Sequence, residues 1–147
     1  MTYNVVATDD VPTLDLSTDE ETPPDLDIQD IDGALGCTNV AVKIWHFEQG
    51  EEIGYHAHAR QEELFYVLDG QFSVKLGRSG AEEYIEADEG TFWMAAPKVG
   101  RGHRCVSEGG GSVLAIGAPP VDDPGIDPHS LSEAEIDEAL DEWNDPA

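Results

Sequence analysis

Polar and apolar residues alternate along the middle of the chain, and this pattern predicts β-strands. From Thr38 the segment TNVAVKIWHFEQG alternates and is rich in Val, Ile and aromatic residues, so we predict a strand that ends at Gly50. Further short apolar segments follow, separated by Gly, Asp, Ser or Pro: EEIGYHAH, ELFYVLDG, QFSVKLG, EEYIEA, TFWMAA, HRCVS and SVLAIGAPP. Strands spaced about ten residues apart without an intervening helix predict an antiparallel sandwich or barrel.

The strongest turn signal in the chain lies between two of these strands. Asp69-Gly70 separates ELFYVL from QFSVKLG, and a short Asp-Gly turn between alternating segments is typical of a β-hairpin. We therefore predict that these two strands pair directly. No segment shows the strand-helix-strand pattern of a parallel sheet, so the sequence indicates an all-β domain.

The pattern changes on both sides of this strand-rich region. Residues 1–37 lack apolar periodicity and contain TDEETPPDLD, which predicts an acidic N-terminal arm that is partly ordered, with a short strand at YNVVAT as an option. Residues 38–118 form the predicted barrel. Residues 119–147 predict an acidic linker followed by a short C-terminal α-helix.

This helix has both a start signal and an apolar stripe. Ser130 and Ser132 are each followed by Glu three residues later, as in a capping box, and Asp145-Pro146 stops the pattern. The apolar stripe consists of Ile136, Leu140 and Trp143. We expect Trp143 to dock the helix on the outside of the barrel.

The net charge of the chain is strongly negative. The 32 acidic and 7 basic residues give a formal charge of −25, and residues 1–35 and 121–147 each hold ten acids and no Lys or Arg. Phosphate binding needs clustered basic residues, so we exclude nucleic acid and anionic membranes as partners. Two interpretations remain: adaptation to a salt-rich cytoplasm, which makes the source a halophile and which we favour, and an ordinary domain with two solvated acidic flanks.

The chain carries no recognisable membrane or export signal. It lacks the roughly 18 to 20 apolar residues in a row that a membrane helix needs, and its start has no basic and apolar regions of a signal peptide. Cys37 and Cys105 are too few for a disulfide framework. We therefore expect a cytoplasmic protein.

Residues with metal-binding side chains gather in the segment GYHAHARQEELFYVLDG. His56 and His58 are one residue apart, so on a strand both point to the same face of the sheet. Glu63 begins the next predicted strand and shares the inward parity of Phe65, whereas Glu62 has the opposite parity and faces solvent. This spacing brings two imidazoles and a carboxylate to one place.

A further imidazole, His103, lies at the head of another predicted strand after KVGRG. Three neutral imidazoles and one carboxylate suit Fe, Mn, Ni, Co or Zn and leave coordination positions open for water or substrate. We predict one divalent transition metal per chain, with His56, His58, Glu63 and His103 as its ligands. We interpret His46 and His129 as surface or internally satisfied histidines.

These residues resemble the cupin superfamily. The first motif of that family is Gly, five residues, His-x-His, three or four residues, Glu, six residues, Gly. The residues that match every spacing are Gly50, His56, His58, Glu63 and Gly70. The resemblance covers about residues 38–118 and implies a small jelly-roll β-barrel with the metal inside it, and pairing of chains into a homodimer.

The second cupin motif is matched more loosely. Gly90, Pro97, Gly100 and His103 are present, but one extra residue separates Gly90 from Pro97 and one more separates Pro97 from Gly100. Ser107 stands where the family usually has Asn. The resemblance implies His103 as the fourth ligand.

Basic residues gather near the two motifs. Of the 7 in the chain, the four inside the motif windows are Arg60, Lys98, Arg101 and Arg104. An electropositive rim of this kind would admit a carboxylate or phosphate substrate; the alternative is local neutralisation of nearby acids. Arg104 has the opposite parity to His103 and should point outward.

Other residues are candidates for a substrate pocket. Phe72, Phe92 and Met94 could line it, although aromatic residues at strand spacing are more often core. Cys105 shares the inward parity of His103, and the alternative is a small buried apolar residue. Together with Arg60 and Arg101, these residues make up the predicted pocket.

The resulting functional prediction is a small-molecule metalloenzyme, with a dioxygenase-like oxidoreductase favoured. Glu63 would be a ligand and a candidate proton acceptor. The alternatives are a metal-dependent isomerase or decarboxylase, and a non-catalytic module that binds a metabolite or a metal. The preference for an oxidoreductase is implied by the resemblance, and the sequence itself does not choose the substrate.

Overall fold

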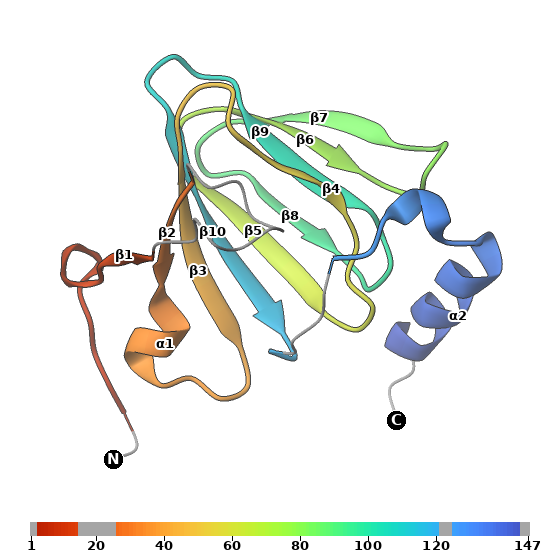
Figure 1. The fold of residues 1–147 in the computed structure, drawn as a ribbon, viewed down its shortest axis with the longest axis horizontal. Coiled ribbons are helices and arrows are strands. Elements are labelled where there is room, and N and C mark those ends of the chain that lie inside the picture. The colour runs from red at the N-terminus through yellow and green to blue at the C-terminus, as the bar shows by residue number, and fades with distance from the viewer. Residues whose placement is uncertain (1–2, 15–25, 121–124, 145–147) are drawn as a thin grey trace.

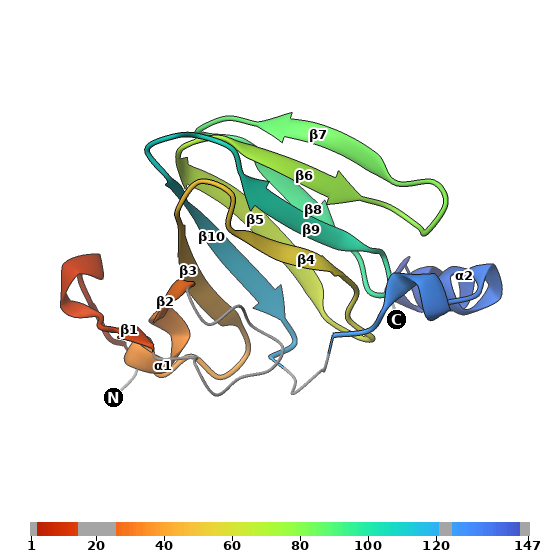
Figure 2. The same ribbon diagram turned by 45° about the horizontal axis from the view of Figure 1, so that its top comes forward.

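The computed structural model describes residues 3–14, 26–120 and 125–144, and in this part of the chain two antiparallel sheets face each other (Figures 1 and 2). The larger sheet has the order β1-β2-β3-β10-β5-β8. Its strands are β1 (Thr13–Leu14), β2 (Asp27–Asp30), β3 (Ala41–Phe47), β5 (Glu62–Asp69), β8 (Phe92–Ala95) and β10 (Gly111–Ala118). The smaller sheet, in the order β4-β9-β6-β7, contains β4 (Glu52–His56), β6 (Phe72–Leu76), β7 (Glu83–Ala87) and β9 (Arg101–Cys105). The all-β jelly-roll barrel predicted from the sequence is confirmed.

The turn at Asp69-Gly70 joins strands of different sheets, so the predicted hairpin is wrong. β5 pairs with β10 and β8, whereas β6 pairs with β7 and β9. Gly70 has a φ of +83°, and a Cβ added to it would lie 2.4 Å from the carbonyl oxygen of Gly110. The dipeptide does make the tight left-handed turn that its sequence indicates. Because each flanking strand finds its partners elsewhere, this turn is a corner between the sheets.

The space between the sheets is filled by an apolar core. The residues that are at most 3% exposed and belong to it include Phe65, Val67, Phe72, Val74 and Val113. They come from both sheets and have the inward parity that the alternation predicts. This core supports the strands on which the candidate site is built.

The N-terminal flank adds strands to the larger sheet. β2 pairs with β3, and helix α1 (Ile31–Leu35) follows directly. The Gln29 side chain is buried; it donates hydrogen bonds to the carbonyl oxygens of Thr8 and Val11 and shares a 2.7 Å hydrogen bond with His46. His46 is therefore a satisfied histidine. The suggested strand at YNVVAT (residues 3–8) does not form; the short 3-10 helix η1 (Thr8–Asp10) begins at its last residue.

Lys43 anchors this flank to the barrel. Its Nζ lies 2.6 Å from an oxygen of Asp30 and 2.6 Å from an oxygen of Asp32. Burial acts to lower the pKa of Lys43, but the hydrogen bonds to the two carboxylates outweigh it and the pKa is raised. The acids on this flank are thus partly neutralised by the barrel. Residues 15–25 of the predicted arm lie outside the described residues.

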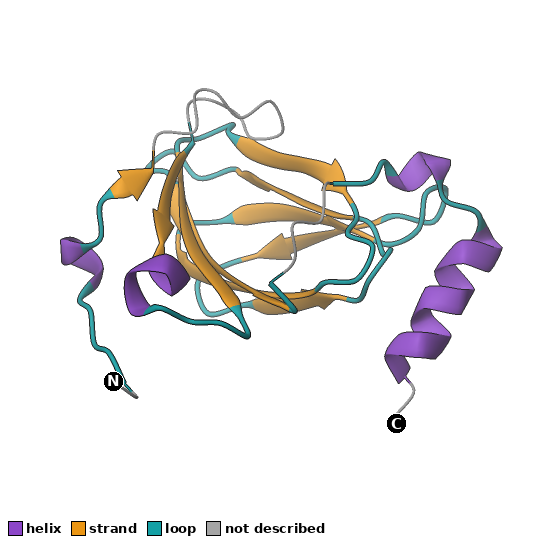
Figure 3. Ribbon diagram, turned by 60° about the horizontal axis from the view of Figure 1, so that its bottom comes forward, coloured by secondary structure: helices purple, strands orange, loops and turns teal. Residues whose placement is uncertain are grey.

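The C-terminal flank contains the predicted helix, α2 (Glu133–Asn144), preceded by the 3-10 helix η2 (Pro128–Ser130). Ser132 is the residue that caps α2: its Oγ accepts from the amide of Glu135, and the Glu135 carboxylate accepts from the Ser132 amide. Of the predicted apolar stripe, Ile136 is buried, Leu140 is half-buried and Trp143 is 39% exposed, whereas Ala139, outside that stripe, is buried. Figure 3 shows α1 and α2 on opposite sides of the barrel. The predicted stop at Asp145-Pro146 and residues 121–124 of the linker lie outside the described residues.

No helix in the described ranges is long and apolar enough to cross a membrane.

Candidate metal centre

The structure brings the residues of the first motif together. His56 ends β4, His58 follows two residues later, and Glu63 is the second residue of β5. Glu63 Oε1 lies 3.3 Å from His58 Nε2 and 4.0 Å from His56 Nε2. Ligands about 2.1 Å from a common ion can lie at most about 4.2 Å apart, so these two distances suit one metal ion. One ligand atom from each residue lies within 4.8 Å of the other two.

His56 is oriented by its own strand. Its Nδ1 lies 2.7 Å from the carbonyl oxygen of Gly54, and because a carbonyl can only accept, Nδ1 carries the proton. Burial lowers the pKa of His56, although this hydrogen bond acts in the opposite direction, so the ring is neutral near pH 7. The Nε2 lone pair is therefore free to bind a metal, in the arrangement common to metal-binding histidines.

Glu63 is held ionised by its neighbours. Burial acts to raise the pKa of its carboxyl group, but the hydrogen bond with His58 and the positive charge of Arg101 outweigh it and the pKa is lowered. Glu63 has the same inward parity as Phe65 and Val67, as predicted. An ionised, inward-pointing carboxylate is the form that binds a divalent cation.

Arg101 lies beside Glu63 and not on the rim of the pocket. It is 0% exposed; its Nη2 donates to the carbonyl oxygens of Ala95 and Ala96, and its Nη1 lies 3.6 Å from Glu63 Oε1. Arg101 is therefore not part of the predicted electropositive rim, because it lies on the inward face of β9, where its guanidinium is buried. Arg101 supplies positive charge to the site from within the barrel wall.

His103 lies in the same cavity but outside the close group of three ligand atoms. It is 4% exposed and surrounded by the rings of Phe47, Phe65, Phe72 and Trp93, with centroids 5.3 to 6.0 Å away. Burial lowers its pKa to about 3, so the ring is neutral. Neither ring nitrogen has a hydrogen-bond partner among the described residues. Its assignment as a fourth ligand stays a prediction.

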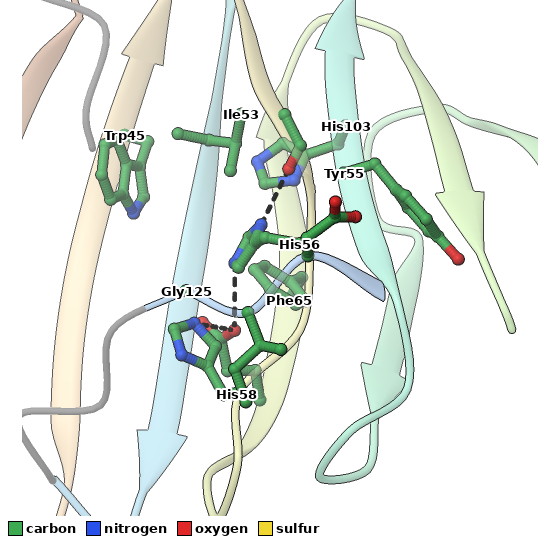
Figure 4. A pocket seen from close by; sticks show the side chains of 12 residues that line it. Trp45, Ile53, Tyr55, His56, His58, Phe65, His103 and Gly125 are labelled. Atoms are coloured by element: carbon green, nitrogen blue, oxygen red, sulfur yellow. Dashed lines mark hydrogen bonds and ion pairs between the residues drawn. The ribbon is translucent and has the colours of Figure 1, made fainter. Parts of the chain in front are cut away.

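A cavity of about 480 Å³ opens over these residues, and Figure 4 shows His56 between His103 and His58 inside it. Its apolar walls come from Trp45, Ile53, Tyr55 and Phe65. Gly125, Ile126 and Asp127 close another side. This volume is within the range of small-molecule sites in proteins.

The other predicted pocket residues lie elsewhere. Phe92 and Met94 are 63% and 45% exposed, and they alternate with the buried Trp93 and Ala95; β8 therefore turns them to the outer face, and the pocket prediction is wrong for both. Phe72 and Cys105 are buried in the apolar core, which is the alternative given for them. Neither lines the cavity.

Among the remaining basic residues, Arg60 and Arg104 are exposed, the latter as its parity predicts. Neither lines the cavity. Lys98 has a φ of 62°, which is uncommon for a residue other than glycine, and its amide donates to the carbonyl oxygen of His58 at 2.6 Å. The extra residue between Pro97 and Gly100 is thus accommodated in a left-handed turn that contacts the first motif.

Sequence reasoning missed several residues of the cavity. Trp45 shares the parity of Phe47, so its inward side could have been inferred. Ile53 and Tyr55 have the opposite parity to His56 and line the same cavity because the register of β4 shifts between Ile53 and His56, which the sequence does not indicate. Residues 125–127 could not be inferred either, because they lie after the barrel and carry no signal for a return to it. Glu62 has the predicted parity, but it accepts a hydrogen bond from Trp143 and does not simply face solvent.

Comparison with known proteins gives the family and the fold. The sequence model of the cupin domain matches residues 43–117, just over half of the 147 residues. Comparison with curated proteins finds no match.

Several solved structures share the fold. KdgF from Halomonas sp. has a TM-score of 0.66 and 18% identity, with 81% of this chain and 96% of KdgF covered. An oxalate decarboxylase mutant from Bacillus subtilis has a TM-score of 0.64 and 16% identity, covering 83% of this chain and 31% of that one. A sugar phosphate isomerase of the cupin superfamily from Silicibacter pomeroyi has a TM-score of 0.60 and 14% identity, covering 78% of this chain and 75% of that one. At these identities the likeness shows the fold alone.

Proposed function

The chain belongs to the cupin family, and on that premise we propose that it is a metal-dependent enzyme acting on a small molecule, with a dioxygenase-like oxidation favoured. The observation that carries this proposal is the close group formed by His56, His58 and Glu63 at the wall of a cavity of about 480 Å³. Three protein ligands leave coordination positions open, and the cavity leaves room for a substrate beside them.

The residues present suit a divalent transition metal. His56 and His58 would supply neutral imidazole nitrogens and Glu63 a carboxylate oxygen. His103 adds a buried, neutral imidazole whose nitrogens lack a hydrogen-bond partner among the described residues, and buried polar atoms of this kind usually have one. A bound metal would supply Lewis-acid chemistry or, if it is iron, redox chemistry.

Glu63 has a second role in this proposal, as an acceptor for a proton of the substrate. Its low pKa makes it a weak base, and Arg101 at 3.6 Å favours the ionised form. The apolar walls of the cavity limit the water around the reacting groups, which are 15 to 24% exposed, and this strengthens the electrostatic interactions between them. An anionic substrate remains one option, although Arg101 lies in the barrel wall and not at the opening.

Two alternatives have a different chemistry or none. A metal-dependent isomerase or decarboxylase would need no redox-active metal. A binding module would hold a metabolite or a metal without changing it. The predicted homodimer is independent of this choice, and sedimentation equilibrium would measure it.

The first experiment is metal analysis of protein purified without added metal, followed by oxygen uptake with the iron-loaded protein over small phenols, diketones and thiols. We expect about one metal ion per chain. We expect its loss in His56→Ala and its retention in the control His46→Gln, a histidine that is hydrogen-bonded to Gln29 and does not line the cavity. Oxygen uptake supports the dioxygenase, whereas its absence with an iron-loaded sample rejects that reaction.

The binding module is tested separately. A ligand that raises the melting temperature but stays chemically unchanged after long incubation favours binding without turnover. Wild-type protein that contains no metal and does not bind added metal overturns the metal site itself.

A further inference from the structure

The C-terminal segment returns to the barrel at a residue between two proposed ligands. The amide of Ala57 donates to the carbonyl oxygen of Ile126 at 2.9 Å, and the amide of Ile126 donates to the carbonyl oxygen of Ala57 at 2.8 Å. Ala57 is 0% exposed and lies between His56 and His58 in the chain. This two-residue bridge therefore fixes the backbone that carries both histidines.

The same segment makes a second contact beside the third ligand. Trp143 Nε1 in α2 donates to Glu62 Oε2 at 2.5 Å, and Glu62 directly precedes Glu63. Figures 1 and 2 show α2 next to the end of the barrel where β4 ends and β5 begins. The segment thus contacts both parts of the chain that supply the close group of ligands.

Residues 125–127 also close the cavity. Gly125, Ile126 and Asp127 line it, and a Cβ added to Gly125 would lie 3.7 Å from His56 Cβ. If residues 125–144 moved away, the cavity would lose a wall, and the bridge to Ala57 would break.

The attachment of α2 is weak in electrostatic terms. The helix carries six acidic residues. Among the described residues, Asp137 of α2 forms an ion pair with Arg78 at 2.6 Å. Asp137 is 61% exposed, so this pair contributes little. The surplus of like charge places α2 among the less stable parts of the fold.

We propose that residues 125–144 form a strap whose docking positions His56, His58 and Glu63, so that strap docking and metal binding strengthen each other. The proposal rests on the proposed metal site and adds Ile126 and Trp143 as positioning residues. By thermodynamic linkage, the factor by which docking raises metal affinity equals the factor by which metal favours docking.

Titration with Co²⁺, followed by its visible absorption, tests the first half of this coupling on the full chain. In Trp143→Ala we expect about tenfold weaker Co²⁺ binding, the lower end of the range for residues that support metal ligands. Trp143→Phe keeps an aromatic ring but removes the N–H donor, and it should give a smaller loss of Co²⁺ affinity. Ile126→Pro removes one hydrogen bond of the bridge, and Ile126→Val keeps it. The control Glu142→Gln, next to Trp143 on an exposed part of α2, should bind Co²⁺ like the wild type.

Hydrogen exchange of the α2 amides tests the second half. We expect saturating Co²⁺ to slow exchange in the wild type by about the factor that Trp143→Ala loses in affinity, and to slow it less in that variant. Circular dichroism confirms that each variant is folded. The coupling is overturned if Co²⁺ affinity is unchanged in Trp143→Ala, Trp143→Phe and Ile126→Pro. It is also overturned if Co²⁺ does not change the rate of hydrogen exchange in α2. A wild type that binds no Co²⁺ overturns the metal site and the coupling with it.

Discussion

The barrel interior has an ionic end and an apolar end, and the same strands pass through both. The inward side chains are, in chain order, Glu63, Phe65 and Val67 on β5 and Arg101, His103 and Cys105 on β9. At the apolar end, burial itself stabilises the fold. At the ionic end, each charge is tolerated because its partner is present, and ion pairs of this kind are often no better for stability than apolar residues. The difference is the one that the proposed metal site would require, since stability alone does not favour buried charges.

The largest effect is expected from a cavity at the apolar end. Phe72 is 1% exposed and packs edge-on against Phe47 at a centroid distance of 5.1 Å. Phe72→Ala should lower the free energy of unfolding by about 4 kcal/mol. It should reduce the Co²⁺ affinity of the folded protein less than Glu63→Gln does, because, among the proposed ligands, Phe72 contacts only the ring of His103. Urea unfolding and Co²⁺ titration measure the two quantities. Phe92→Ala, at a position 63% exposed, is the matched control and should change neither. A comparable loss of Co²⁺ affinity in Phe72→Ala would contradict the division into two ends.

A slightly smaller effect is expected when a charge at the ionic end loses its partner. Glu63→Gln leaves the buried Arg101 without this carboxylate, so the metal-free protein should lose about 3 kcal/mol of unfolding free energy. The exposed Glu86→Gln on β7 is the control and should cost little. Equal stability of Glu63→Gln and wild type would mean that Arg101 is compensated without Glu63.

The free energy of unfolding should depend on pH through His103, which lies between the ionic end and the apolar end. His103 has a folded-state pKa of about 3, against 6.5 for an ordinary histidine, so between these values the unfolded chain binds more protons. Stability should therefore fall as the pH drops below 6.5, by about 2 kcal/mol at pH 5 for this group. Urea unfolding of metal-free protein from pH 7.5 to 5 measures it. The slope of unfolding free energy against pH measures how many more protons the unfolded chain binds. His103→Phe should reduce that number by up to one, while the contribution of Glu63 remains. An unchanged slope would show that His103 does not stay neutral.

The smallest effect concerns salt, which distinguishes charges inside the barrel from those outside. Raising KCl from 0.1 M to 1 M shortens the Debye length from about 10 Å to about 3 Å, so repulsion among the exposed acids weakens and the protein should become more stable. We expect a gain of about 1 kcal/mol or less, the range of exposed charge interactions. Wild type and Glu63→Gln should gain equally, because buried pairs are screened little. Loss of stability in high salt would contradict the prediction that the acidic surface is adapted to high salt.

Much of the fold could be predicted from alternation and turn residues. The strands from β3 to β10, the helix α2 and its capping by Ser132 follow from local pattern, because side-chain parity and capping are local properties. The sheet to which a strand belongs is not local. The Asp69-Gly70 signal predicts a reversal of the chain, but partners far along the chain decide that β5 and β6 lie in different sheets.

The candidate site divides in the same way. The spacing of His56, His58 and Glu63 predicted that they lie close together, because the three residues are near one another in the chain and their positions depend on local strand geometry. Arg101 shares the parity of His103, which indicates the barrel interior, but its charge suggested the surface instead. The contact of Trp143 with Glu62 joins residues 81 positions apart and leaves no trace in either segment.

The alternation of consecutive strands between the sheets also bears on how quickly the protein acquires its native state. Most ladders join strands that are distant in sequence, such as β3 with β10 and β4 with β9. Topologies dominated by pairing of distant strands fold slowly, over milliseconds to seconds. The chain must lose the entropy of closing long loops before the stabilising contacts can form. Arg101 reaches Glu63, and His103 enters the cavity, only once β9 has paired with β4 and β6. The nascent chain therefore exposes the residues proposed to bind the metal before the barrel encloses them.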